Sequence, residues 1–108
     1  MIPQITVAEL ARWRADASRA GPLMVDVREP WEFDYCRIDG SLSIPLAELT
    51  RRQAELPRGR ALVMVCHHGR RSQHAAMLLA GAGFGQVHNL QGGVEAWAAE
   101  IEPTMKRY

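Results

Sequence analysis

The chain has 108 residues, a length that suits a single domain, and nothing in its composition is typical of disorder or of a disulfide scaffold. Its formal net charge is only +1, so no broad electrostatic field favours nucleic acid or a membrane surface as a partner. Hydrophobic residues make up 47% of the chain, which is enough for a buried core, but their runs are too short to span a bilayer.

The beginning of the chain predicts a short strand followed by a helix. Residues 1–4 lack the basic start and apolar block of a secretory signal, so we expect a cytoplasmic protein. Residues 5–7 have the apolar character of a brief strand. Thr6 and Glu9 have the spacing of a capping box, which predicts that a helix begins there.

The next stretch predicts a buried strand and several small elements. Residues 23–27 are apolar apart from Asp26, as strands covered on both faces tend to be. Residues 29–33 suit the start of a helix, because proline is tolerated in the first turn and acidic residues there favour the positive end of the helix dipole. We expect a short strand at residues 42–44 and one or two small helices between residues 46 and 56.

Residues 61–65 give the strongest strand signal in the chain, and this strand places Cys66 at its carboxyl end. A helix is expected from residue 72 to the glycines after residue 80. A further strand at residues 86–90 and a last helix at residues 92–100 follow. Short strands alternating with helices predict an α/β protein with a mainly parallel sheet.

No repeat or linker interrupts this pattern, so one domain is expected over residues 1–108, with a core of about residues 4–100 and a short C-terminal tail. We expect the protein to be a monomer. The sequence gives no indication of a nucleic acid or membrane partner.

Cys66 lies where ligands bind in open α/β sheets, in the crevice at the carboxyl ends of the strands. The strand-to-helix loop after it consists of His67, His68, Gly69, Arg70, Arg71 and Ser72. Such a loop is expected to turn several N–H groups toward one point, and the following helix adds partial positive charge. These donors would stabilise a thiolate or a persulfide anion, so Cys66 is predicted to be a nucleophile. The arginines suit an anionic substrate with several oxygens.

Free cysteines are often ordinary core residues, and this is the role expected of Cys36. For Cys66, the basic loop and the helix that follow favour a reactive thiol instead. A disulfide between the two is not expected in a reducing compartment. His67 and His68 invite a metal role, but neighbours in a tight turn usually point apart and no third residue has the spacing of a zinc ligand. We therefore expect no metal and no other cofactor.

Four segments, in this order, resemble the rhodanese-like sulfurtransferase family in its small single-domain form. They are residues 25–33, residues 38–46, the loop at residues 66–72, and residues 92–97 with their paired glycines and tryptophan. The likeness extends over nearly the whole chain. It implies a central parallel five-stranded sheet flanked by helices on both faces.

The resemblance also implies a double displacement at Cys66. Its thiolate would attack the outer sulfur of thiosulfate or a similar anionic donor, and the persulfide would then pass its sulfur to a thiol, cyanide or a protein acceptor. The loop amides would hold the persulfide, and Arg70 or Arg71 would neutralise the leaving sulfite. Asp26 and Arg28, at the end of a neighbouring strand, are expected to brace the site through an ion pair.

Two alternatives remain open at this point. Related folds include phosphatases whose cysteine loop ends in arginine, but those loops are one residue longer so that a phosphate fits, whereas four residues separate Cys66 from Arg71 here. The other alternative is a non-catalytic, rhodanese-shaped binding or regulatory module. The retained cysteine in an intact basic loop argues against it.

Overall fold

Five short strands form one parallel sheet in the computed structural model, which describes all 108 residues. The strands are β1 (Gln4–Ile5), β2 (Leu23–Asp26), β3 (Leu42–Ser43), β4 (Leu62–Val65) and β5 (Val87–Leu90). They pair in the order β1-β5-β4-β2-β3, and every pair is parallel. Because β4 is the central strand, the residue that follows it emerges at the middle of the carboxyl edge of the sheet.

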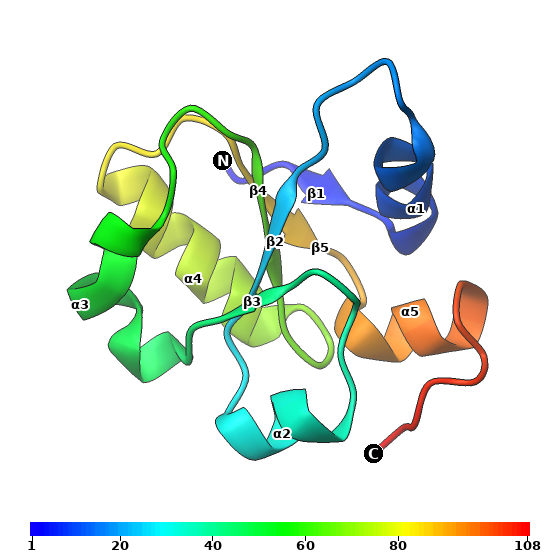
Figure 1. The fold of residues 1–108 in the computed structure, drawn as a ribbon. Coiled ribbons are helices and arrows are strands. Elements are labelled where there is room, and N and C mark those ends of the chain that lie inside the picture. Colours follow the sequence, from blue (N-terminus) through cyan, green and yellow to red (C-terminus); the bar gives the residue numbers. More distant parts are fainter.

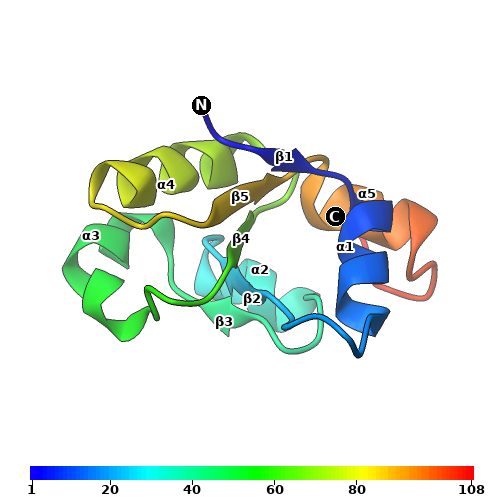
Figure 2. The same cartoon turned by 90° about the horizontal axis from the view of Figure 1, so that it is seen from above.

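Helices connect the strands and cover both faces of the sheet. They are α1 (Val7–Ala15), α2 (Pro30–Tyr35), α3 (Leu49–Arg52), α4 (Arg70–Gly81) and α5 (Gly93–Glu100), with 3₁₀ turns at Leu46–Glu48 and Gln53–Glu55. Helices α3 and α4 lie on one side of the sheet and α1 and α5 on the other (Figure 1, Figure 2). This arrangement confirms the predicted α/β fold. None of the helices combines the length and apolar character that crossing a bilayer requires.

Two apolar clusters form the core, one on each face of the sheet. Successive side chains of β4 point to opposite faces, so Val63 and Val65 pack with α1 and α5. Leu62 and Met64 pack with α3 and α4 in the second cluster, and Cys66 continues that set. Burial on both faces explains why the sequence of this strand is apolar throughout instead of alternating.

Several element boundaries differ by one or two residues from the sequence prediction. The first strand ends at Ile5 because Thr6 caps α1: its hydroxyl accepts the Glu9 N–H at 3.1 Å, and the Glu9 carboxylate accepts the Thr6 N–H at 2.9 Å. The predicted capping box is therefore confirmed. Helix α4 begins at Arg70 instead of Ser72, because Gly69 adopts a φ of 107° and ends the loop there.

The segment after α5, residues 101–108, folds back onto the domain. Met105 is buried in the core cluster on the α1 and α5 side. Tyr108 reaches α2, where its ring makes edge contacts with Trp31 and Tyr35 at centroid distances of 5.5 and 5.9 Å. The short tail expected from the sequence therefore packs against the carboxyl edge of the sheet.

Candidate active site

Cys66 follows the last residue of β4 and is 1% exposed. Its Sγ accepts the N–H of Gly69 at 3.1 Å and lies 3.3 Å from the hydroxyl of Ser72. Cys66 is also a member of the apolar cluster that packs with α3 and α4. The prediction that several loop amides converge on this atom is wrong in number, because Gly69 alone donates to it.

A buried hydrogen-bond network holds the loop in this conformation. The Ser72 hydroxyl donates to Asn89 Oδ1 at 2.5 Å, and Asn89 Nδ2 donates to the carbonyl of Gly69 at 3.2 Å and to Gln4 Oε1 at 2.8 Å. Since Ser72 has one proton and gives it to Asn89, a neutral Cys66 thiol donates to Ser72. Sequence reasoning missed Asn89, although a polar residue inside a buried strand is a signal that could have found it.

The first turn of α5 is fastened to the carbonyl groups of the loop. The N–H of Val94 donates to the Cys66 carbonyl at 2.9 Å, and the N–H of Glu95 donates to the His67 carbonyl at 3.1 Å. Gly93 makes this approach possible: a Cβ at that position would lie 2.4 Å from the Cys66 carbonyl oxygen. The glycine pair of the sequence motif thus allows α5 to pack against the loop after β4.

The two loop arginines have different surroundings. Arg71 makes a bidentate ion pair with Glu32 of α2, at 2.7 and 2.9 Å, whereas Arg70 is exposed and forms no ion pair. The Arg71 guanidinium, together with the Tyr108 hydroxyl that donates at 2.7 Å, lowers the pKa of Glu32 to about 2. Burial raises the pKa of Tyr108 to about 12. Neither Glu32 nor Tyr108 was predicted, since long stretches of chain separate them from the loop.

Asp26 and Arg28 form a fully buried ion pair of 2.7 Å at the end of β2. Burial opposes the charge of Arg28, but the hydrogen bonds and charge of Asp26, together with Tyr108, outweigh it and raise the pKa of Arg28 above its ordinary value. The guanidinium also donates to the carbonyl of Cys36 at 2.6 Å and to the Tyr108 hydroxyl at 2.9 Å. The pair forms no hydrogen bond to Cys66; Arg28 instead contacts α2 through the carbonyl of Glu32 at 3.3 Å and the tail through Tyr108.

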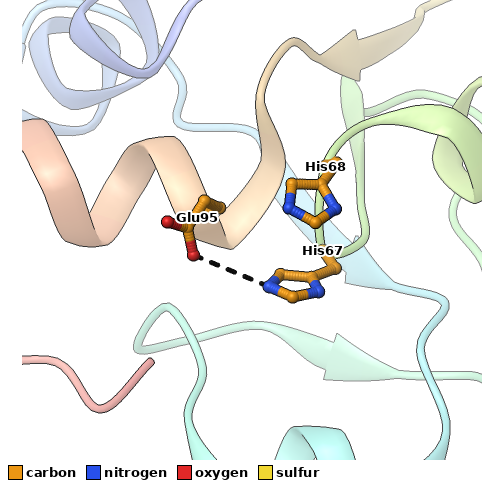
Figure 3. Close-up of side chains that lie close together, drawn as sticks. All are labelled: His67, His68 and Glu95. Carbon is orange, nitrogen blue, oxygen red and sulfur yellow. Dashed lines mark ion pairs between the residues drawn. The ribbon is translucent and has the colours of Figure 1, made fainter. Parts of the chain in front are cut away.

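His67 and His68 lie together instead of pointing apart, which overturns the expectation for adjacent residues in a tight turn. Their rings stack with centroids 4.0 Å apart and planes at 28°. Glu95 of α5 faces them, with its Oε1 3.6 Å from His67 Nε2 (Figure 3). Burial lowers the pKa of His67, and His68 beside it lowers this pKa further. No local sequence pattern associates Glu95 with this pair.

A pocket of about 340 Å³ is lined by Cys66, His67, His68, Arg70 and Arg71. It brings together five of the seven loop residues that the sequence singled out. Gly69 and Ser72 contact the sulfur directly and do not line this pocket. The arrangement places the Cys66 sulfur at a pocket that carries positive charge and ring nitrogens, which suits the approach of an anion.

Fold and pocket together define an α/β protein with a cysteine at the carboxyl edge of a parallel sheet, in a basic loop. The sequence matches the Rhodanese-like domain over residues 6–100, and the chain belongs to that family. The family resemblance seen in the sequence is therefore confirmed.

Similar proteins whose names include sulfurtransferase support this family membership. The chain is 40% identical over 106 residues to "Probable adenylyltransferase/sulfurtransferase MoeZ" of Mycobacterium tuberculosis, covering 96% of the chain but only 26% of that protein. It thus spans about a quarter of the length of this relative. It is 38% identical over 77 residues to "Thiosulfate sulfurtransferase GlpE" of Pseudomonas syringae, covering 71% of the chain and 73% of the relative.

Among solved structures, a rhodanese-related protein from Thermoplasma volcanium superimposes with a TM-score of 0.83 at 30% identity. The match covers 94% of this chain and 95% of the other. The two proteins share the fold over almost their entire length.

Proposed function

We propose that this protein is a sulfurtransferase that carries sulfane sulfur as a persulfide on Cys66, with thiosulfate or a similar anion as donor. The observation that carries the proposal is the position of Cys66 Sγ: it receives the Gly69 N–H at 3.1 Å beside a pocket lined by two histidines and two arginines. An amide donor favours an anionic sulfur, and the basic pocket favours an anionic donor molecule.

The reaction has two displacements. In the first, the Cys66 thiolate attacks the outer sulfur of thiosulfate; a sulfur–sulfur bond forms, the bond within thiosulfate breaks, and sulfite leaves with the electron pair. In the second, a nucleophilic acceptor such as a thiol or cyanide attacks the outer sulfur of the persulfide, and Cys66 leaves as the thiolate. No net oxidation of the protein occurs over the cycle.

Each residue around the sulfur has a role in this scheme. The Gly69 N–H stays in place through the cycle, because Asn89 holds the Gly69 carbonyl. The Ser72 hydroxyl can rotate its proton from Asn89 to Sγ when the thiol proton is lost, which adds a second donor to the anion. Arg70 is the uncommitted cation of the pocket and is assigned to the sulfonate oxygens of the donor.

Intact-mass measurement after incubation with thiosulfate tests the carrier chemistry. The parent protein should gain one sulfur atom, and peptide mapping should place it on Cys66. Cyanide should then remove it as thiocyanate. The matched control is Cys36→Ser, which removes the other buried thiol and should leave both results unchanged.

The variant Cys66→Ser should form no thiocyanate above background while keeping the circular dichroism spectrum of the parent. Thiocyanate formation by this variant, or a sulfur atom found on Cys36, would contradict the proposed nucleophile. A parent protein that takes up no sulfur from thiosulfate would contradict the proposed donor.

A further inference from the structure

Three side chains with metal-binding atoms lie close together beside the Cys66 pocket, which two of them line. His67, His68 and Glu95 each offer one such atom, and these atoms all lie within 4.8 Å of one another (Figure 3). The histidines come from the loop after β4 and the carboxylate comes from α5. Backbone hydrogen bonds from the first turn of α5 to the loop carbonyls hold this helix beside the histidines. Ligands on two fastened elements are held at a fixed separation before any ion arrives.

His67 is fixed in orientation and has an unused ring nitrogen. Its ring lies between those of His68 and Tyr108, with centroids 4.0 Å away on each side. Its Nε2 is buried and has no hydrogen-bond partner, since the 3.6 Å to Glu95 Oε1 is too long for one. A buried polar atom without a partner is uncommon and requires an explanation.

Glu95 is oriented so that one carboxylate oxygen remains available. Its Oε2 is engaged by the guanidinium of Arg107, while its Oε1 faces His67. Carboxylate ligands of metal sites are commonly held in this way, with a second group hydrogen-bonded to the oxygen that does not bind the ion.

We propose that His67, His68 and Glu95 form a binding site for a divalent transition metal ion of the zinc class. Two imidazole nitrogens and one carboxylate oxygen suit Zn²⁺, whereas Mg²⁺ and Ca²⁺ prefer oxygen ligands alone. Three protein ligands leave a fourth tetrahedral position for water. The site shares His67 and His68 with the pocket beside Cys66, but neither Cys66 nor Ser72 belongs to it.

The thiolate of Cys66 is itself a potential zinc ligand in the same pocket, so the test uses the Cys66→Ser protein. Isothermal titration calorimetry with Zn²⁺ should show one equivalent bound per chain. In that background, His68→Ala and Glu95→Gln should each weaken binding about tenfold or more, because each removes one of three ligands. The matched control is His74→Ala, which changes an exposed residue of α4 and should leave zinc affinity unchanged.

Cobalt substitution gives a second readout that does not depend on affinity. Co²⁺ bound to the Cys66→Ser protein should show the visible absorption of a low-coordinate site, and Glu95→Gln should lower it. Absence of zinc binding to the Cys66→Ser protein would overturn the proposal. A His68→Ala or Glu95→Gln variant that binds zinc as tightly as the Cys66→Ser protein would also overturn it, because the ion would then bind elsewhere.

Discussion

Arg70 and Arg71 are neighbours in the sequence, yet only Arg70 has a charge that no carboxylate offsets. An exposed charge interacts with an anion by about 1 kcal/mol in water, so Arg70→Ala should raise the KM for thiosulfate about fivefold. The effect should shrink as ionic strength rises. Steady-state kinetics at low and high salt measure both.

The control for Arg70→Ala is Arg12→Ala, which removes the same charge from the exposed side of α1. It should change neither the KM nor its salt dependence by a comparable amount. Equal effects of the two variants would show that the net charge of the protein, and not a contact in the pocket, attracts the donor.

Glu32 makes the stability of this protein depend on pH. Its pKa is lowered from 4.5 to about 2 in the folded protein, first by the Arg71 hydrogen bonds. A depressed carboxyl pKa stabilises the fold above the unfolded-state pKa, and this contribution is lost as pH falls toward the folded-state value. Between about pH 6 and about pH 3, the parent should lose about 2 kcal/mol more unfolding free energy than Glu32→Gln.

Urea unfolding followed by the fluorescence of the three tryptophans measures this difference. Other carboxylates titrate in the same range in both proteins, so the difference between the two curves isolates Glu32. Parallel curves would show that the Arg71–Glu32 pair does not stabilise the folded state.

The residues of the pocket were predictable to the extent that they are close in sequence. Cys66 and Arg71 lie in one short loop, and the strand before it has a clear apolar pattern. Glu32 and Tyr108 reach the same place through tertiary contacts that span most of the chain, which no local pattern encodes. Asn89 falls between: its polarity in a buried strand was visible, but its partner was not.

At the level of elements, α5 packs closely against the loop after β4, and Gly93 makes this close approach possible. An alanine there would place its Cβ 2.4 Å from the Cys66 carbonyl oxygen, at a φ of +57°. Gly93→Ala should therefore lower the unfolding free energy by about 3 kcal/mol, from strain and overpacking together. It should also lower thiocyanate formation, because α5 can no longer hold the loop. Urea unfolding and the cyanide assay measure these effects.

Gly81→Ala is the matched control for Gly93→Ala. Gly81 ends α4, and a Cβ there would meet nothing within 4 Å. The change should be neutral or stabilising by up to about 1 kcal/mol, since alanine restricts the unfolded chain. If Gly93→Ala behaved like Gly81→Ala, the close approach of α5 would not be needed for the position of the loop.

Element type was easier to predict than element boundaries. The capping box located the start of α1, because both of its partners lie within one turn of sequence. The start of α4 was placed two residues late, since Arg70 and Arg71 carry no capping signature and the positive φ of Gly69 sets the boundary. The strand order of the sheet depends on long-range pairing and could come only from the family resemblance.

Arg28 connects three separate segments of the chain at the carboxyl edge of the sheet. It bonds Asp26 at the end of β2, the Cys36 carbonyl after α2, and Tyr108 in the tail. The side chain is fully buried, so its charge depends on Asp26 for compensation. Loss of this ion pair should therefore lower the stability of the whole fold, and not only change the site.

Asp26→Asn should lower the unfolding free energy by about 3 to 5 kcal/mol, because it leaves a buried guanidinium without its counter-charge. That is a large share of the roughly 5 to 15 kcal/mol that stabilises a typical domain. Urea unfolding measures the loss. The comparison is Glu48→Gln, which breaks the partly exposed Glu48–Arg52 pair and should cost at most about 1 kcal/mol. Similar costs for the two variants would mean that the carbonyl and Tyr108 hydrogen bonds hold Arg28 without Asp26.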